Sequence, residues 1–160
     1  MNIYLLRHGT AEDREIGEPD ASRALTKEGR RELRAVLQQA REAGVRPGAI
    51  LTSPLTRAVE TARIASTELQ CDNVVEMKEL TPDTPPPQVW RAIRSQRSVR
   101  ELVLAGHEPQ LSRLAAFLLE APLAIDLKKG ALLKIAVQDS QGPPRGVLKW
   151  MLTPKLAGGK

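Results

Sequence analysis

Two histidines and two arginines are the residues of this 160-residue chain best suited to chemistry on an anionic group. His8 directly follows Arg7, His107 directly follows Gly106, and the chain contains no further histidine. Arg57 lies between the two histidines in the sequence. Arginine presents forked donors to phosphate oxygens, and a neutral imidazole nitrogen can attack phosphorus. If the fold brings the four side chains together, they are suited to a phosphoryl group.

Each candidate follows a short apolar run that predicts a strand. Residues 3–6 precede the Arg7-His8 pair, residues 49–52 precede the segment that carries Arg57, and residues 102–105 precede Gly106 and His107. In an open α/β sheet, ligands bind beyond the carboxyl ends of the parallel strands. We therefore expect three strand ends to place the two guanidinium groups and the two imidazoles at one edge of the sheet.

Two helices are predicted next to these strands. The first begins after Thr26 as N-cap and ends at Gly44, because apolar residues recur between them at spacings of three and four. The second is predicted to begin with Ser53 as N-cap and Pro54 in the first helical position. Arg57 then lies in the first turn, away from the apolar stripe. A cation is unfavourable there unless an anion binds nearby, so this position also favours an anion site.

The remaining pattern continues the alternation of strands and helices. A strand is predicted at residues 74–77, a short helix around residues 89–93, a helix from Pro109, and a hairpin formed by residues 131–137 and 147–152. The polar, acidic segment 10–22 between the first strand and the first helix is predicted to be a surface loop. The expected fold is a three-layer α/β/α sandwich with a mostly parallel, mixed central sheet, and residues 1–160 are expected to form a single domain.

Composition narrows the range of partners. The chain carries 24 basic and 19 acidic side chains, a formal net charge of +5. Much of this excess lies between residues 23 and 46, where we interpret it as a solvated helix face. Nucleic-acid binding is only a minor alternative. Such proteins stack aromatic side chains on bases, and this chain has few of them: one Tyr, one Phe and two Trp.

The apolar N-terminal segment and the single cysteine bear on location. Residues 1–6 are too short for the core of a signal peptide, and no later run approaches the roughly 18 apolar residues of a membrane span. Cys71 has no intramolecular partner for a disulfide and cannot supply a thiolate zinc cluster. We therefore expect a cytoplasmic protein that is not associated with a membrane.

Three motifs resemble, in the right order, those of the histidine phosphatase superfamily, whose fold is called phosphoglycerate mutase-like. They are Leu6-Arg7-His8-Gly9-Thr10, Leu51-Thr52-Ser53-Pro54-Leu55-Thr56-Arg57-Ala58 and Gly106-His107, and together they span most of the chain. The short length and the run Glu79-Leu80-Thr81-Pro82 are most similar to the small SixA-type phosphohistidine phosphatases. The resemblance implies that His8 is the nucleophile, transiently phosphorylated, and that Arg7, Arg57 and His107 bind the phosphoryl oxygens. It implies no metal ion and no cofactor.

The substrate expected from this reading is phosphohistidine in a protein, such as a phosphotransfer domain. Residues 58–106 leave little room for a large lid insertion, so a shallow, open pocket is expected. A phosphohistidine leaves as imidazole, whereas a phosphomonoester requires a proton donor; Glu79 and Glu12 are candidates that no motif assigns.

Three other activities remain open. The main alternative is a small-molecule phosphomonoesterase of the same superfamily, in which Arg91, Arg94 and Arg97 contact further phosphates. A mutase is less expected, because it needs an enclosed site. A non-catalytic phosphate-binding module is a minor alternative. In each case the ligand is a phosphoester or phosphate.

Overall fold

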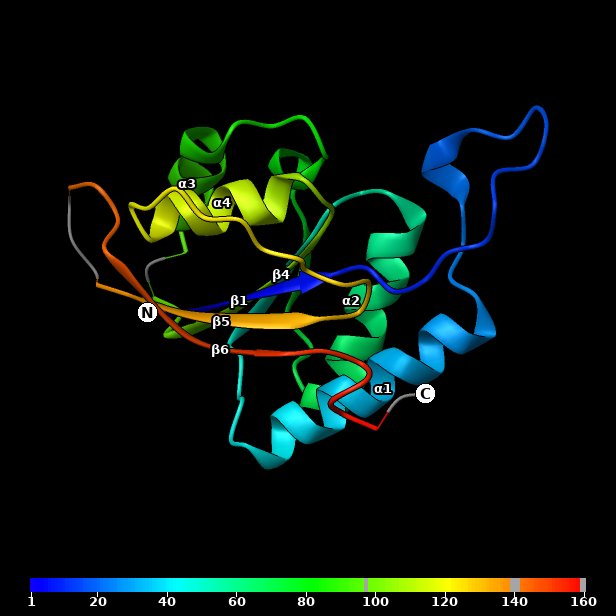
Figure 1. Cartoon of the computed structure of the whole chain (residues 1–160), viewed down its shortest axis with the longest axis horizontal. Coiled ribbons are helices and arrows are strands. Elements are labelled where there is room, and N and C mark those ends of the chain that lie inside the picture. Colours follow the sequence, from blue (N-terminus) through cyan, green and yellow to red (C-terminus); the bar gives the residue numbers. More distant parts are fainter. Residues whose placement is uncertain (97, 139–141, 159–160) are drawn as a thin grey trace.

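Strands and helices alternate through the first two thirds of the chain, and the last two strands form a hairpin (Figure 1). The computed structural model describes residues 1–96, 98–138 and 142–158. The strands are β1 (Asn2–Arg7), β2 (Ala49–Thr52), β3 (Val74–Glu76), β4 (Glu101–Gly106), β5 (Leu132–Val137) and β6 (Gly146–Leu152). The helices are α1 (Lys27–Glu42), α2 (Thr56–Leu69), α3 (Pro86–Arg94) and α4 (Gln110–Leu118), with 3-10 turns η1 (Asp20–Ser22) and η2 (Lys78–Leu80).

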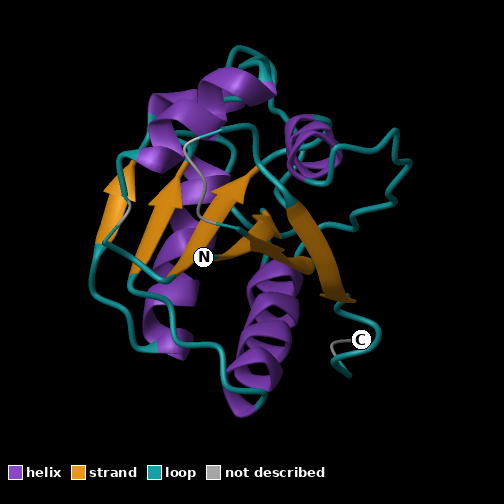
Figure 2. Ribbon diagram, turned by 90° about the vertical axis from the view of Figure 1, so that its left-hand side faces the viewer, coloured by secondary structure: helices purple, strands orange, loops and turns teal. Residues whose placement is uncertain are grey.

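The six strands form one mixed sheet in the order β3-β2-β4-β1-β5-β6. Strands β3, β2, β4 and β1 run parallel, while β5 is antiparallel to β1 and β6 is antiparallel to β5. Figure 2 shows the strands side by side with helices on both sides. The predicted three-layer α/β/α sandwich with a mostly parallel sheet is therefore confirmed.

The alternation of side chains along β1 supplies both faces of the core. Ile3 and Leu5 pack into the apolar cluster that includes residues of α3 and α4. Tyr4 and Leu6 pack into a second cluster, on the other face, with residues of α1 and α2. Because successive side chains of a strand point to opposite faces, one strand with a buried centre, residues 3–6, holds both helical layers against the sheet. Its carboxyl end is correspondingly fixed.

No helix among the described residues is both long and apolar enough to cross a membrane.

The starts of α1 and α2 differ in how well the sequence predicted them. Thr26 is the N-cap of α1, and its hydroxyl accepts a hydrogen bond from the Gly29 amide at 2.9 Å. Ser53 is not the N-cap of α2: the helix begins at Thr56 after Leu55, and no side chain caps it. The Ser53 hydroxyl does accept from a backbone amide, that of Leu55 at 3.3 Å. The same hydroxyl also lies 2.8 Å from Nε2 of His107, a contact that the sequence did not indicate.

The loop after β1 is tied to the first turn of α1. The Thr10 carbonyl accepts hydrogen bonds from the Thr26 amide at 2.9 Å and the Thr26 hydroxyl at 3.3 Å. Ala11 forms an isolated antiparallel bridge with Leu25. A methyl group on Gly29 would collide with the backbone of Thr10. The segment predicted as a plain surface loop is thus anchored at both ends, at Ala11 and at the η1 turn.

Replacing Gly29 by alanine tests this close approach. In an open helix, alanine would add about 1 kcal/mol of stability over glycine. Here we expect Gly29→Ala to destabilise the protein by about 1–3 kcal/mol, because the methyl group must displace the Thr10 backbone. Thermal unfolding should shift down by roughly 2–4 °C per kcal/mol. Gly142→Ala is the control, since no described atom lies within 4 Å of a methyl group there. Equal or higher stability of Gly29→Ala would contradict the packing.

Candidate active site

Three strand ends meet at one edge of the sheet and carry the predicted residues there. The His8 amide donates to the Gly106 carbonyl at 3.0 Å, and the Ser53 amide donates to the Ala105 carbonyl at 3.0 Å. These bonds extend the parallel pairing of β1, β4 and β2 past the last strand residues. The rings of His8 and His107 lie with their centroids 5.2 Å apart. The sheet therefore brings both imidazoles into one site.

The hydrogen bonds of His8 fix which ring nitrogen carries the proton. Its Nδ1 lies 2.7 Å from the Gly9 carbonyl oxygen, and its Nε2 lies 3.3 Å from the Nε of Arg57. A carbonyl only accepts and a guanidinium only donates, so the network assigns the proton to Nδ1 and leaves a lone pair on Nε2. Nε2 of His8 is consequently the unprotonated ring nitrogen, which faces Arg57.

His8 is held in its neutral form. Burial lowers the pKa of its imidazole to about 4; the Gly9 carbonyl opposes this shift, and the nearby charges of Arg57, Arg7 and Lys129 add to it. The ordinary histidine pKa is near 6.5. His8 is 6% exposed. At neutral pH the Nε2 lone pair is thus free of a proton, as nucleophilic attack requires.

His107 is more deeply buried and also neutral. Desolvation, followed by the proximity of His8 and Arg57, lowers the pKa of His107 to about 3. Its Nε2 lies 2.8 Å from the Ser53 hydroxyl. Its buried Nδ1 has no hydrogen-bond partner within the described part of the chain. Buried polar atoms are normally paired, so this nitrogen is a place where a ligand atom fits.

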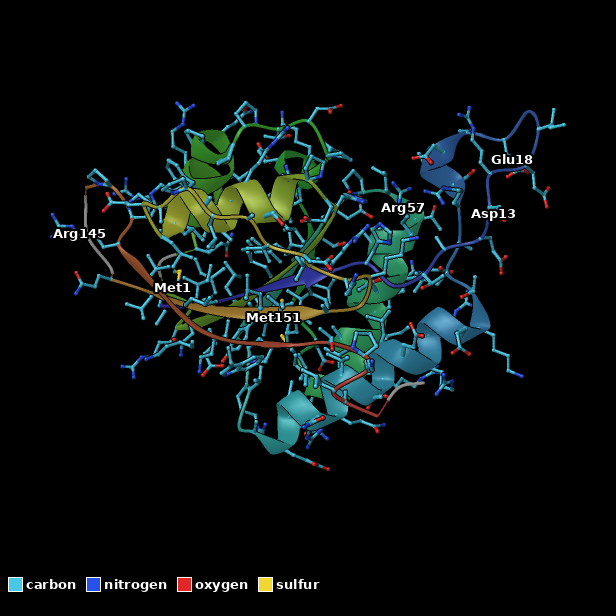
Figure 3. The ribbon with its side chains drawn as sticks, viewed as in Figure 1. Met1, Asp13, Glu18, Arg57, Arg145 and Met151 are labelled. Atoms are coloured by element: carbon cyan, nitrogen blue, oxygen red, sulfur yellow. The ribbon has the colours of Figure 1, made fainter. Side chains whose placement is uncertain are left out.

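Arg57 is a buried cation that is bound by Asp20 in the loop that follows β1. Its Nη1 donates to the Asp20 carbonyl at 3.1 Å, and its Nη2 lies 3.2 Å from the Asp20 carboxylate. Figure 3 shows Arg57 near this loop, which also carries Asp13 and Glu18. Burial lowers the pKa of the Arg57 guanidinium, and Asp20 opposes the shift. With its end held by Asp20, the guanidinium turns its Nε edge to Nε2 of His8.

Asp20 is itself held by a second arginine. Its other carboxylate oxygen accepts from the Nε of Arg23 at 2.9 Å. Desolvation raises the pKa of Asp20, but the charges and hydrogen bonds of Arg57 and Arg23 outweigh it and lower the pKa overall. Asp20 therefore remains ionised at neutral pH and links the half-buried Arg23 to the buried Arg57.

Arg7 enters the site from the end of β1. Its Nη1 donates to the Leu127 carbonyl at 2.8 Å, and its amide donates to the Ala131 carbonyl at 3.1 Å. Its Nε is buried and has no hydrogen-bond acceptor within the residues that the structure describes. An N–H that is always charged and lacks an acceptor suits an anionic oxygen. Arg7, like His107, thus has an unused group for a ligand.

Three supporting residues were not singled out by the sequence analysis. Asp20 was noted only as part of an acidic loop, and Ser53 only as an N-cap. Thr61 accepts from the Gly9 amide at 3.2 Å and donates to the Arg57 carbonyl at 2.7 Å, which ties the turn after His8 to the helix of Arg57. Thr61 lies one turn after Arg57 in α2, a spacing that could have indicated a shared face. Nothing in the sequence links Asp20 to Arg57.

Glu12 and Glu79, the two candidate proton donors, form no hydrogen bond or ion pair through their carboxylates within the described ranges. Arg91 and Arg94 are in the last turn of α3, and the Arg94 guanidinium lies 6.0 Å from the centre of the Trp90 ring. Arg97 lies outside the described residues.

The three described side chains at the centre of the site are buried: His8, Arg57 and His107 are 6%, 5% and 2% exposed. In the described part of the chain, no three His, Cys, Asp or Glu side chains gather closely enough to hold a metal ion.

Comparisons with known proteins agree with this arrangement. The family model described as histidine phosphatase superfamily (branch 1) matches residues 3–82. An uncharacterised protein of Picosynechococcus sp. is 33% identical over 131 residues, which cover 72% of this chain and 71% of that protein. The mitochondrial serine/threonine-protein phosphatase Pgam5 of Drosophila ananassae is 35% identical over 102 residues, covering 59% of this chain but 35% of that longer protein.

Solved structures show the same fold at lower sequence identity. The protein histidine phosphatase SixA, complexed with tungstate, superposes with a TM-score of 0.86 at 24% identity, covering 97% of this chain and 98% of SixA. The alpha-ribazole phosphatase of Shigella flexneri superposes with a TM-score of 0.77 at 17% identity, covering 96% and 97% of the two chains. From the family match, the Picosynechococcus relative and the shared fold, we conclude that the chain belongs to the histidine phosphatase superfamily.

Proposed function

We propose that this protein hydrolyses a phosphoryl group through a covalent phosphohistidine on His8, and that its substrate is phosphohistidine in a protein. The observation that carries the proposal is the state of His8: its Nε2 is unprotonated and accepts a hydrogen bond from the Nε–H of Arg57 at 3.3 Å. The low pKa of His8, about 4, keeps that lone pair available at neutral pH. Arg7, Arg57 and His107 bind the phosphoryl oxygens in this scheme.

In the first step, the Nε–H of Arg57 shifts from Nε2 of His8 to a phosphoryl oxygen. Nε2 then attacks phosphorus while the bond from phosphorus to the leaving nitrogen breaks. The His8 ring gains positive charge, and its Nδ1–H already donates to the Gly9 carbonyl at 2.7 Å, so that hydrogen bond strengthens as the charge forms. The charge on the phosphoryl oxygens in the loose transition state is offset by the fixed guanidinium groups of Arg7 and Arg57.

In the second step, water attacks the phosphorus on His8, the P–N bond breaks, and inorganic phosphate leaves. His8 regains its Nε2 lone pair and retains its Nδ1 proton. The proton released by the attacking water passes to phosphate or solvent. The side chains of the enzyme are then back in their starting state.

The leaving group favours a phosphohistidine substrate over a phosphomonoester. A phosphohistidine whose ring is protonated releases neutral imidazole and needs no proton donor, whereas an alkoxide must be protonated as it leaves. The similarity to SixA in fold supports the same substrate class.

The substrate class is tested with purified wild-type protein and three substrates: a phosphorylated histidine-phosphotransfer domain, phosphoimidazole and p-nitrophenyl phosphate. We expect kcat/KM to be highest for the phosphodomain, and phosphate to be trapped on His8 by a quench that avoids acid. His8→Ala should abolish turnover, with a loss of at least about 10³-fold, because the nucleophile is gone.

Three other results of these assays would contradict the proposed substrate or mechanism. Rapid hydrolysis of p-nitrophenyl phosphate with an untouched phosphodomain would favour a small-molecule phosphomonoesterase. Phosphate trapped on another residue would overturn the mechanism. Turnover that is unchanged in His8→Ala would identify a non-catalytic phosphate-binding module with a contaminating activity.

The low pKa values predict an unusual pH dependence. The folded protein should keep His8 neutral down to pH about 4 and His107 neutral down to about 3, whereas an unfolded chain protonates both below about 6.5. Proton NMR of the two ring Cε1–H signals should therefore show no titration between pH 8 and 5. Stability should decline as the pH falls from about 6.5 to 4, because the unfolded chain binds more protons in that window. A ring that titrates near 6.5 would contradict the described environment.

Arg57→Ala provides a check on the cause of this shift. Burial is the largest contribution to the low pKa of His8, and the charge of Arg57 is a smaller one. The pKa of His8 should therefore rise in Arg57→Ala but stay below 6.5. The same NMR titration measures it.

Asp20 is expected to act as a positioning residue for Arg57. Asp20→Asn keeps the backbone carbonyl that accepts from Arg57 Nη1 but removes the ion pair to Nη2. We expect kcat on phosphoimidazole to fall about tenfold, because the guanidinium loses its fixed direction, and KM not to rise, because a negative charge leaves the site. Asp13→Asn, in the same exposed loop, is the matched control and should leave kcat unchanged. If kcat of Asp20→Asn equals that of wild type, Asp20 has no positioning role.

A further inference from the structure

A cavity of about 670 Å³ lies beside the candidate active site and is not used by the proposed chemistry. Its walls come from three separate parts of the chain. Glu32 of α1 forms one side, Lys128 and Lys129 before β5 form another, and the segment after β6 with Pro154 and Lys155 closes the third. The chain thus gathers three lysines around one hollow.

The cavity opens at the same edge of the sheet as His8. Leu6 of β1 pairs with Leu132 at the start of β5, which in turn pairs with Leu152 at the end of β6. The segments that line the cavity therefore adjoin the carboxyl end of β1. Figure 1 shows the end of β6 and the start of β5 at the side of the molecule to which β1 points.

Backbone bonds and charge connect the cavity wall to the catalytic residues. The Gly130 amide lies 3.1 Å from the carbonyl oxygens of both Arg7 and His8. The charge of the neighbouring Lys129 contributes to the lowered pKa of His8. A group bound in the cavity would consequently lie close to a phosphoryl group on His8.

The cavity has an excess of positive charge. Lys128 is paired with Asp126 at 2.7 Å. Lys129 and Lys155 form no ion pair with the described residues, and Glu32 is the carboxylate that faces them. The pKa of Glu32 is raised by burial and by the neighbouring Glu28. Two ammonium groups without an ion pair face one carboxylate, so the lining keeps a net positive charge that further acidic groups can neutralise.

We propose that this cavity binds Asp and Glu side chains of the phosphoprotein substrate that flank its phosphohistidine. The inference rests on the proposed function, because it names the surface of the substrate that the enzyme recognises. The described residues of the lining include lysines and no arginine. Lysine is a mobile, hydrated point charge that suits carboxylates spread over a protein surface, whereas the forked donors that bind a phosphate are at the catalytic residues. The cavity volume of about 670 Å³ also exceeds what one small anion fills.

Charge reversal at Lys155 tests the site without touching the catalytic residues. Lys155 is exposed, and Lys149 on β6 is an equally exposed lysine that lines a different cavity with Met1 and Asn2. The variants Lys155→Glu and Lys149→Glu thus make the same change of charge at two places. Lys129 is left unchanged because its charge acts on His8.

Binding is measured in the His8→Ala background, which holds a substrate without turning it over. The probe is a histidine-phosphotransfer domain, phosphorylated with phosphoramidate, that has acidic residues beside its phosphohistidine. We expect Lys155→Glu to raise its Kd about tenfold at low salt, an effect that fades near 0.5 M salt, and Lys149→Glu to change it less than about twofold. If the flanking acids of the probe are replaced by amides, Lys155→Glu should have no further effect on Kd. With His8 present, Lys155→Glu should leave kcat/KM for phosphoimidazole unchanged.

The outcomes separate this proposal from the proposed function. If the wild type turns over the phosphodomain and the Kd in the His8→Ala background is the same with and without Lys155→Glu, the cavity proposal is overturned and the function is left intact. Salt-sensitive binding that Lys155→Glu weakens, without turnover by the wild type, would support the cavity and overturn the function. Equal losses in Lys155→Glu and Lys149→Glu would assign the effect to net charge and overturn the cavity proposal, as would the absence of binding.

Discussion

A guanidinium cation that is 5% exposed has lost nearly all of its hydration, and Arg57 is held in that state at the edge of the sheet. Burying a charge is costly unless partners replace the lost water. The partners here are the Asp20 carbonyl and carboxylate at one end of the guanidinium and the lone pair of His8 Nε2 on its Nε side. The second partner works only if His8 is neutral, so the burial of Arg57 and the nucleophilic state of His8 support each other.

The sheet makes this arrangement possible by its strand order. In the order β2-β4-β1, three parallel strands end side by side, and the bonds from the His8 amide to Gly106 and from the Ser53 amide to Ala105 hold their ends in register. Core packing on both faces of β1 fixes that edge. The site residues can therefore be desolvated without collapsing, since the backbone that carries them is anchored by apolar contacts on either side of the sheet.

The sequence predicted what depends on local periodicity and on strand ends. The apolar runs before Arg7, Ser53 and Gly106 were enough to place two imidazoles and two guanidinium groups at one edge. Contacts between distant segments could not be predicted in the same way. Asp20 reaches Arg57 from a loop without periodicity, and Ser53 has the residue type of an N-cap but contacts His107 instead.

The types of basic residue divide the active edge into two zones. Where the phosphoryl group reacts, the cations are arginines with fixed directions: Arg57 through Asp20, and Arg7 through the Leu127 carbonyl. Fixed donors stabilise charge that develops in a transition state, because they need no reorganisation as the reaction proceeds. In the adjoining cavity the cations are lysines, whose flexible stems adapt to partners of varied shape. Under the proposed function, rigid guanidinium groups at the reacting atoms and mobile ammonium groups beside them would combine strict chemistry with binding to protein surfaces that differ in detail.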